Sequence, residues 1–72
     1  MITIYEDPML SFRVRWDQMD RFLVTQEYVD GSSIEVDVFD VVAPAPMTYG
    51  DAEITAKQYC DMVRKEFSGR KT

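Results

Sequence analysis

The chain has 72 residues, of which 13 are acidic and 8 are basic, so its net charge is −5, and 46% of its residues are hydrophobic. This composition predicts one folded globular domain and excludes an intrinsically disordered segment. The acidic balance argues against general nucleic-acid binding and against adsorption to an anionic membrane, because both depend on an excess of basic side chains.

Signals for a membrane or for secretion are missing from the sequence. No apolar run approaches the roughly 20 residues of a membrane span, and Met1–Ile4 lacks the basic region that opens a secretory signal. Cys60 is the only cysteine and there is no histidine, so an internal disulfide is impossible and a zinc site would need an unusual set of ligands. We therefore expect a cytoplasmic single domain over residues 1–72, without metal or cofactor.

The first part of the chain shows the alternation that is typical of strands. Apolar and polar residues alternate over residues 2–5 and again over residues 10–16, and Pro8 separates the two runs. This period of two predicts half-buried strands, because successive side chains of a strand point to opposite faces of the sheet. In the second strand the faces are Phe12, Val14 and Trp16 on one side and Ser11, Arg13 and Arg15 on the other.

A hairpin is predicted between strands over residues 21–29 and 33–41, because Asp30-Gly31 lies between them. A two-residue loop would pair Leu23 with Val38 and Val24 with Asp37, which mixes apolar and charged residues on both faces. A three-residue loop over 29–31, with Gly31 in the left-handed conformation, gathers the apolar side chains on one face, so we predict this register. It pairs Phe22 with Val38, Val24 with Val36, and Gln26 with Ile34.

After the strands, the period of the apolar residues changes to that of a helix. Ala43-Pro44-Ala45-Pro46 predicts an extended connector within a linker over 43–48. Thr48 and Asp51 have the spacing of a capping box and predict a helix over 49–68. Its apolar stripe is Ala52, Ala56, Tyr59, Cys60, Val63 and Phe67. The predicted fold class is α+β: an antiparallel β-meander of three to four strands over 2–42, with one C-terminal helix packed on one face.

Residues that could carry chemistry have simpler interpretations in this sequence. Cys60 has no histidine to activate it and lies in the middle of the predicted helix, so we interpret it as a small buried hydrophobic residue. Glu35 and Asp37 alternate with apolar residues and mark the outer face of a strand, and Asp51 and Glu53 suit the start of a helix. No glycine-rich phosphate loop is present. We expect no catalytic activity.

The face of the sheet opposite the helix is the predicted functional surface. Aromatic and aliphatic residues with arginine, bordered by charge, are typical of protein interfaces, although scattered exposed apolar residues are also common on ordinary surfaces. The candidate partner-binding residues on this open face are Tyr5, Arg13, Arg15, Leu23, Glu27 and Phe39.

The leading hypothesis is a small acidic protein-interaction module, an inhibitor or regulator that binds a larger protein complex through this open face. The chain is similar in size and architecture to accessory proteins of phages and mobile elements. This is an analogy that no sequence motif supports. One alternative is a structural protein that forms a homo-oligomer, such as a homodimer, through the same face. Another is a nucleic-acid-binding module that uses Arg13 and Arg15, and a third is an acidic mimic of DNA, which the spread of the acids along the chain does not favour.

Overall fold

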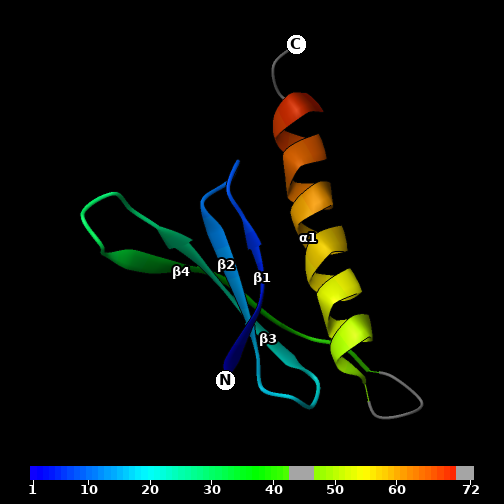
Figure 1. Cartoon of the computed structure of the whole chain (residues 1–72). Coiled ribbons are helices and arrows are strands. Elements are labelled where there is room, and N and C mark those ends of the chain that lie inside the picture. Colours follow the sequence, from blue (N-terminus) through cyan, green and yellow to red (C-terminus); the bar gives the residue numbers. More distant parts are fainter. Residues whose placement is uncertain (43–46, 70–72) are drawn as a thin grey trace.

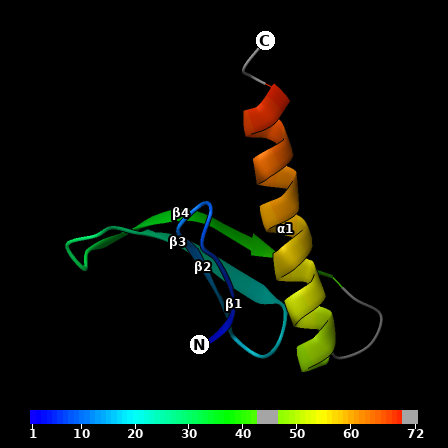
Figure 2. The same ribbon diagram turned by 45° about the horizontal axis from the view of Figure 1, so that its top comes forward.

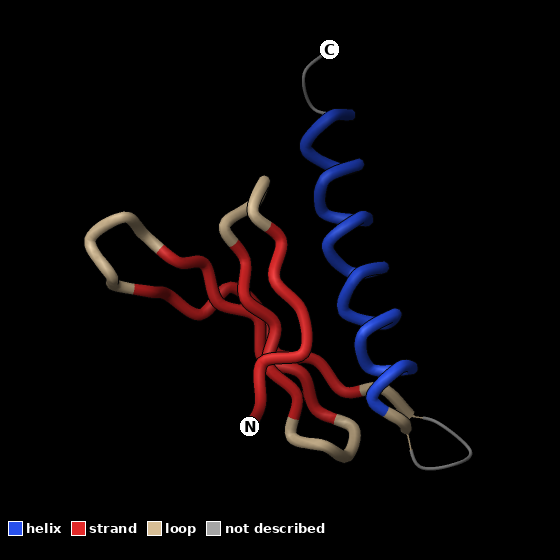
Figure 3. The backbone as a smooth tube through the Cα atoms, in the orientation of Figure 1, coloured by secondary structure: helices blue, strands red, loops and turns tan. Residues whose placement is uncertain are grey.

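The described part of the chain forms a four-stranded antiparallel sheet and one helix (Figures 1 and 3). The computed structural model describes residues 1–42 and 47–69, so the predicted Ala-Pro connector lies outside the described residues. The elements are β1 (Ile2–Asp7), β2 (Phe12–Trp16), β3 (Arg21–Glu27), β4 (Ser33–Asp40) and α1 (Tyr49–Gly69). The strands lie in the order β1-β2-β3-β4, and α1 packs on one face, mainly across β1 and β2. The predicted α+β meander is confirmed.

The core forms between α1 and the apolar face of the two central strands. Phe12, Val14 and Trp16 of β2 are buried, as their alternation predicts, and Phe22 and Val24 of β3 join them. From α1 the core receives the small side chains Ala52, Ala56 and Cys60, all fully buried. Because these three side chains are short, the helix can approach the sheet closely and leave the space to the larger residues of the strands.

The predicted three-residue hairpin loop is confirmed. Gly31 has a φ of +89°, and its N–H donates to the Tyr28 carbonyl oxygen at 3.0 Å, while the Tyr28 N–H donates to the Ser32 carbonyl oxygen at 2.8 Å. Ile34 lies opposite Gln26, as predicted for this loop. A left-handed residue at this position is the usual end of such a loop, and glycine adopts it without a Cβ penalty.

Farther from the loop, the predicted register of this hairpin is wrong. Val36 is an extra residue in β4, a β-bulge, so Val24 pairs with Asp37 and Phe22 pairs with Phe39. The bulge turns Phe39 toward the helix, where its ring stacks on Phe22 and on Tyr59, each at 5.1 Å between centroids. Burial of this aromatic stack stabilises the bulged strand, and the alternation of residues along the sequence does not predict it.

A second bulge lies in the other edge strand. Thr3 pairs with Arg15 and Tyr5 pairs with Val14, so Ile4 is the extra residue of β1. The shift places Tyr5 on the same face as Val14, where it packs against the core. The strand also continues to Asp7, which lies opposite Phe12 and is buried.

The helix begins as its sequence predicts. The Thr48 hydroxyl accepts from the Asp51 N–H at 3.2 Å, and the Asp51 carboxylate accepts from the Thr48 N–H at 3.4 Å. These reciprocal bonds form the capping box. The prediction that Phe67 belongs to the core is wrong: its side chain is 52% exposed, because the last turns of α1 extend beyond the sheet (Figures 1 and 2).

A buried ion pair joins the helix to the turn between β1 and β2. The Asp7 side chain is fully buried, forms a salt bridge with Arg64, and accepts from the N–H groups of Met9 at 3.0 Å and Leu10 at 3.1 Å. Arg64 also pairs with Asp61 on its own helix. The hydrogen bonds and the guanidinium together compensate the cost of burying the carboxylate.

Candidate functional site

The structure divides the six predicted partner-binding residues between the two faces of the sheet. Arg13, Arg15, Leu23 and Glu27 lie on the open face, where Arg15 pairs with Leu23 across β2 and β3. Placing Tyr5 and Phe39 on this face was wrong. Both are turned toward α1 by the bulges at Ile4 and Val36 and pack against the core.

Ion pairs occupy much of the open face. The Arg13 guanidinium lies 3.4 Å from a Glu6 carboxylate oxygen and 3.3 Å from one of Glu27, and the Thr25 hydroxyl donates to Glu27 at 3.2 Å. This is the cross-strand charge pairing expected on the solvent face of a sheet. Arg15 forms no ion pair with any described residue. Tyr5 lies on the other face of the sheet, so it does not accompany Arg13 and Arg15 on the open face.

The most exposed part of the sheet is its last strand. Every residue of β4 except Phe39 is exposed, and the hairpin of β3 and β4 extends away from α1 in both views (Figures 1 and 2). Three aliphatic side chains of this strand remain in contact with solvent: Ile34 is 51% exposed, Val36 41% and Val38 43%. An edge strand with exposed aliphatic residues offers both unpaired backbone groups and apolar surface.

Carboxylates accompany these aliphatic residues on both faces of β4. On the open face, Glu35 lies opposite Thr25 and pairs with no described side chain. Asp40 accepts from Arg21 Nε at 2.9 Å, and this hydrogen bond lowers the pKa of the Asp40 carboxyl. On the helix side, Asp37 accepts from the Tyr59 hydroxyl at 3.1 Å. Burial, with this hydrogen bond, raises the pKa of Tyr59 to about 12.

The bulge explains why the acids of β4 face both ways. In a regular strand Glu35 and Asp37 would share a face, as the sequence predicts. The extra residue Val36 between them sends Asp37 to the helix side and leaves Glu35 on the open side. We call Ile34, Glu35, Val36, Asp37 and Val38 the edge surface.

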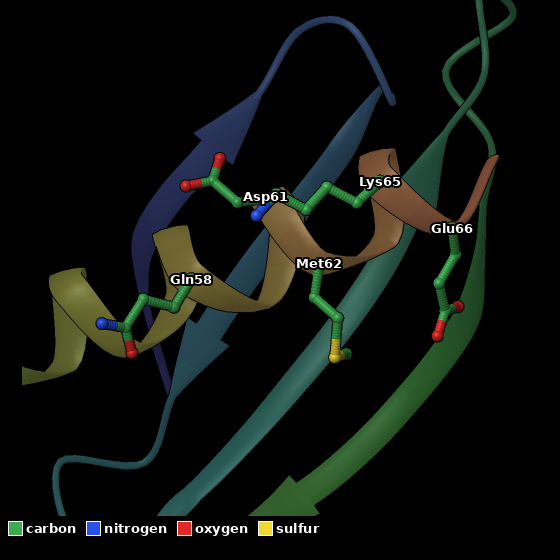
Figure 4. Close-up of a pocket in the computed structure, with 5 residues that line it drawn as sticks. All are labelled: Gln58, Asp61, Met62, Lys65 and Glu66. Atoms are coloured by element: carbon green, nitrogen blue, oxygen red, sulfur yellow. The ribbon is translucent and has the colours of Figure 1, made fainter. Parts of the chain in front are cut away.

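Other features of the structure offer less for function. A shallow hollow on α1 is lined by side chains of this one helix (Figure 4): Gln58, Asp61, Met62, Lys65 and Glu66. Cys60 is fully buried, as predicted, and burial raises the pKa of its thiol to about 11. Within residues 1–42 and 47–69, no cluster of three or more His, Cys, Asp or Glu side chains is arranged to hold a metal ion.

Comparison of the chain with protein-family models, curated proteins and solved structures gives no match. Within the part of the chain that the structure describes, α1 is not apolar enough to cross a membrane. The functional proposal therefore depends on the surface of the molecule alone.

Proposed function

We propose that the chain is a small acidic protein-binding module, an inhibitor or regulator that acts by occupying a surface of a larger protein complex. The proposed binding surface is here moved from the predicted open face to the edge surface of β4, which has residues on both faces of the sheet, and to the adjoining Leu23, which pairs with Val38. The proposal includes a cytoplasmic location, which the single cysteine favours. It also includes a binding role without catalytic activity.

The observation that supports this surface is the exposure of β4. The core-facing residues of β2 are buried, whereas three aliphatic residues of β4 are each more than 40% exposed on a strand whose outer edge pairs with no described part of the chain. Edge strands of monomeric proteins are usually shielded by charged side chains, lysine above all, by proline, by a β-bulge or by a covering element. β4 has three carboxylates and the bulge at Val36, which oppose pairing with another acidic strand. Residues Ser33–Asp40 contain neither lysine nor proline, and an exposed apolar edge of this kind suits a protein partner.

The test is capture of interacting proteins from a lysate of the source cells by the immobilised chain. Val36→Lys with Val38→Lys should abolish specific capture, because the charged side chains disrupt the apolar part of the edge surface. The matched control is Ile54→Lys with Met62→Lys, which changes two exposed apolar residues of α1, 56% and 49% exposed, in the same way. Circular dichroism establishes that both variants fold.

Loss of capture in the β4 variant alone supports the proposal. Capture of the same proteins by the β4 variant and by the unmodified chain contradicts it. Loss in the α1 variant alone would move the binding surface to the helix.

A further inference from the structure

We infer that the edge surface takes an extended, basic segment of a partner protein, which adds to the sheet as a fifth strand beside β4. This inference deepens the proposed function and rests on it. The sheet order ends at β4, which pairs on one side with β3 and on its other side with no described strand. A strand added there would form backbone hydrogen bonds with β4 on either side of the bulge at Val36.

Charge decides between a second copy of the chain and a different partner. The strand carries Glu35, Asp37 and Asp40 and no basic residue, so antiparallel pairing of two β4 strands would bring two sets of three carboxylates together. Like charges on neighbouring strands destabilise pairing. Arg21 offsets Asp40 only, and each chain adds a net charge of −5. Self-association through this edge is therefore opposed, while a basic segment is attracted.

The bulge also restricts where basic residues must lie along the partner strand. Glu35 and Asp37 lie on opposite faces of the sheet, so a complementary strand needs lysine or arginine on both of its faces. Ile34, Val36 and Val38 favour β-branched residues between these bases, because such side chains pack well across strands. A strictly alternating basic strand, with all its charges on one face, would match only half of the acids.

A synthetic peptide with this pattern is the probe: acetyl-Lys-Val-Lys-Val-Thr-Lys-Val-Lys-amide. Its lysines occupy both faces when it is extended. One control replaces the valines with proline, which keeps the charge and removes N–H groups from both edges. A second control replaces the lysines with glutamate, which keeps the strand propensity and reverses the charge. Binding is measured by titration, with amide chemical shifts and hydrogen exchange of the chain as the structural readout.

The expected result is saturable binding of the lysine-valine peptide, at least roughly tenfold tighter than either control, with protection of amides in Ser33–Asp40. Glu35→Lys with Asp37→Lys should weaken binding by roughly tenfold or more, because the bases then face like charge. Glu53→Lys with Glu66→Lys makes the same change in net charge on exposed positions of α1 and should leave binding nearly unchanged.

Four results would overturn the inference. Equal binding of the proline peptide would show charge attraction without strand pairing. Equal weakening of peptide binding by the β4 pair of lysine substitutions and by the α1 pair would show that the position of the acidic residues does not matter. A particle of twice the 8.4 kDa chain mass, with amides of β4 protected in the absence of peptide, would identify a second copy as the occupant. The peptide could also fail to bind, while Val36→Lys with Val38→Lys still abolishes capture of proteins from the lysate. That result would refute the basic partner strand and leave the proposed function supported.

Discussion

Asp7→Ala removes the carboxylate that joins the turn after β1 to the helix. The side chain is fully buried and receives three partners, the N–H groups of Met9 and Leu10 and the guanidinium of Arg64. Removal leaves the two N–H groups without their acceptor and takes from Arg64 one of its two carboxylates, since its pair with Asp61 remains. We expect the loss of these partners together to cost about 3–5 kcal/mol. A typical domain has about 5–15 kcal/mol of stability and a small one lies toward the lower end, so much of the fold's stability depends on this residue.

The partner residue should matter less. Arg64 is 31% exposed, so water can reach the site when it is truncated, and Asp7 keeps its two backbone hydrogen bonds. We expect Arg64→Ala to cost about 1–2 kcal/mol. Asp7→Asn keeps an acceptor oxygen for the turn but puts an amide NH2 group in place of the oxygen that faces Arg64. Its cost should fall between those of the two alanine variants.

Urea unfolding followed by fluorescence is the assay, because Trp16 is the only tryptophan and is 2% exposed. In thermal unfolding followed by the same fluorescence, a shift of about 4–8 °C per kcal/mol means that Asp7→Ala should lower the melting temperature by about 12–40 °C. The exposed Glu53→Ala is the control and should stay within about 0.5 kcal/mol of the unmodified chain. The reasoning is refuted if Asp7→Ala costs less than about 1 kcal/mol, or if Arg64→Ala costs as much as Asp7→Ala.

Three further predictions concern the helix. Thr48→Ala should cost about 1 kcal/mol in the same urea assay, because the capping box loses its hydroxyl; Thr48→Ser should restore it, and equal loss in both would exclude the cap. The Cys60 thiol, buried and with its pKa raised to about 11, should not react with a thiol reagent at pH 8 until the chain is unfolded in guanidinium; fast reaction of the folded chain would contradict its burial. The pKa of Tyr59 is raised to about 12 from 10.0, so its unfolded form ionises first and stability should fall between pH 10 and 12. Tyr59→Phe should reduce that fall, and an unchanged pH profile would contradict the shift.

Sequence reasoning succeeded where the signal is local. The start of α1 follows from Thr48 and Asp51, three residues apart, and their hydrogen bonds form within one turn. The hairpin loop likewise follows from Gly31, whose left-handed conformation most other residues avoid. In both cases the residues that determine the structure are neighbours in the chain, so no knowledge of the packing is needed.

The misplaced residues depend instead on contacts between distant segments. Counting alternate residues places Tyr5 and Phe39 on the open face, and this count fails when an extra residue enters a strand. The bulge in β4 is stabilised by stacking of Phe39 on Tyr59, which only the packed helix provides. Asp7 and Arg64 are 57 residues apart, and no spacing rule connects them. Phe67 has the helical period of a core residue, but whether it is buried depends on where the sheet ends.

Both irregularities of the sheet lie in its edge strands, while β2 and β3 pair without a shift. An edge strand has a neighbour on one side only, so gaining or losing a residue there disturbs one ladder instead of two. Deletion of Val36 would therefore only remove the bulge and leave Phe39 on the side of Tyr59. Deletion of the regularly paired Val38 would instead exchange the sides of Phe39 and Asp40 and carry Phe39 away from Tyr59. Chain length within β4, as much as residue type, determines which side chains the molecule shows to its surroundings, so single-residue insertions and deletions give this fold a route to new surfaces that substitutions alone do not offer.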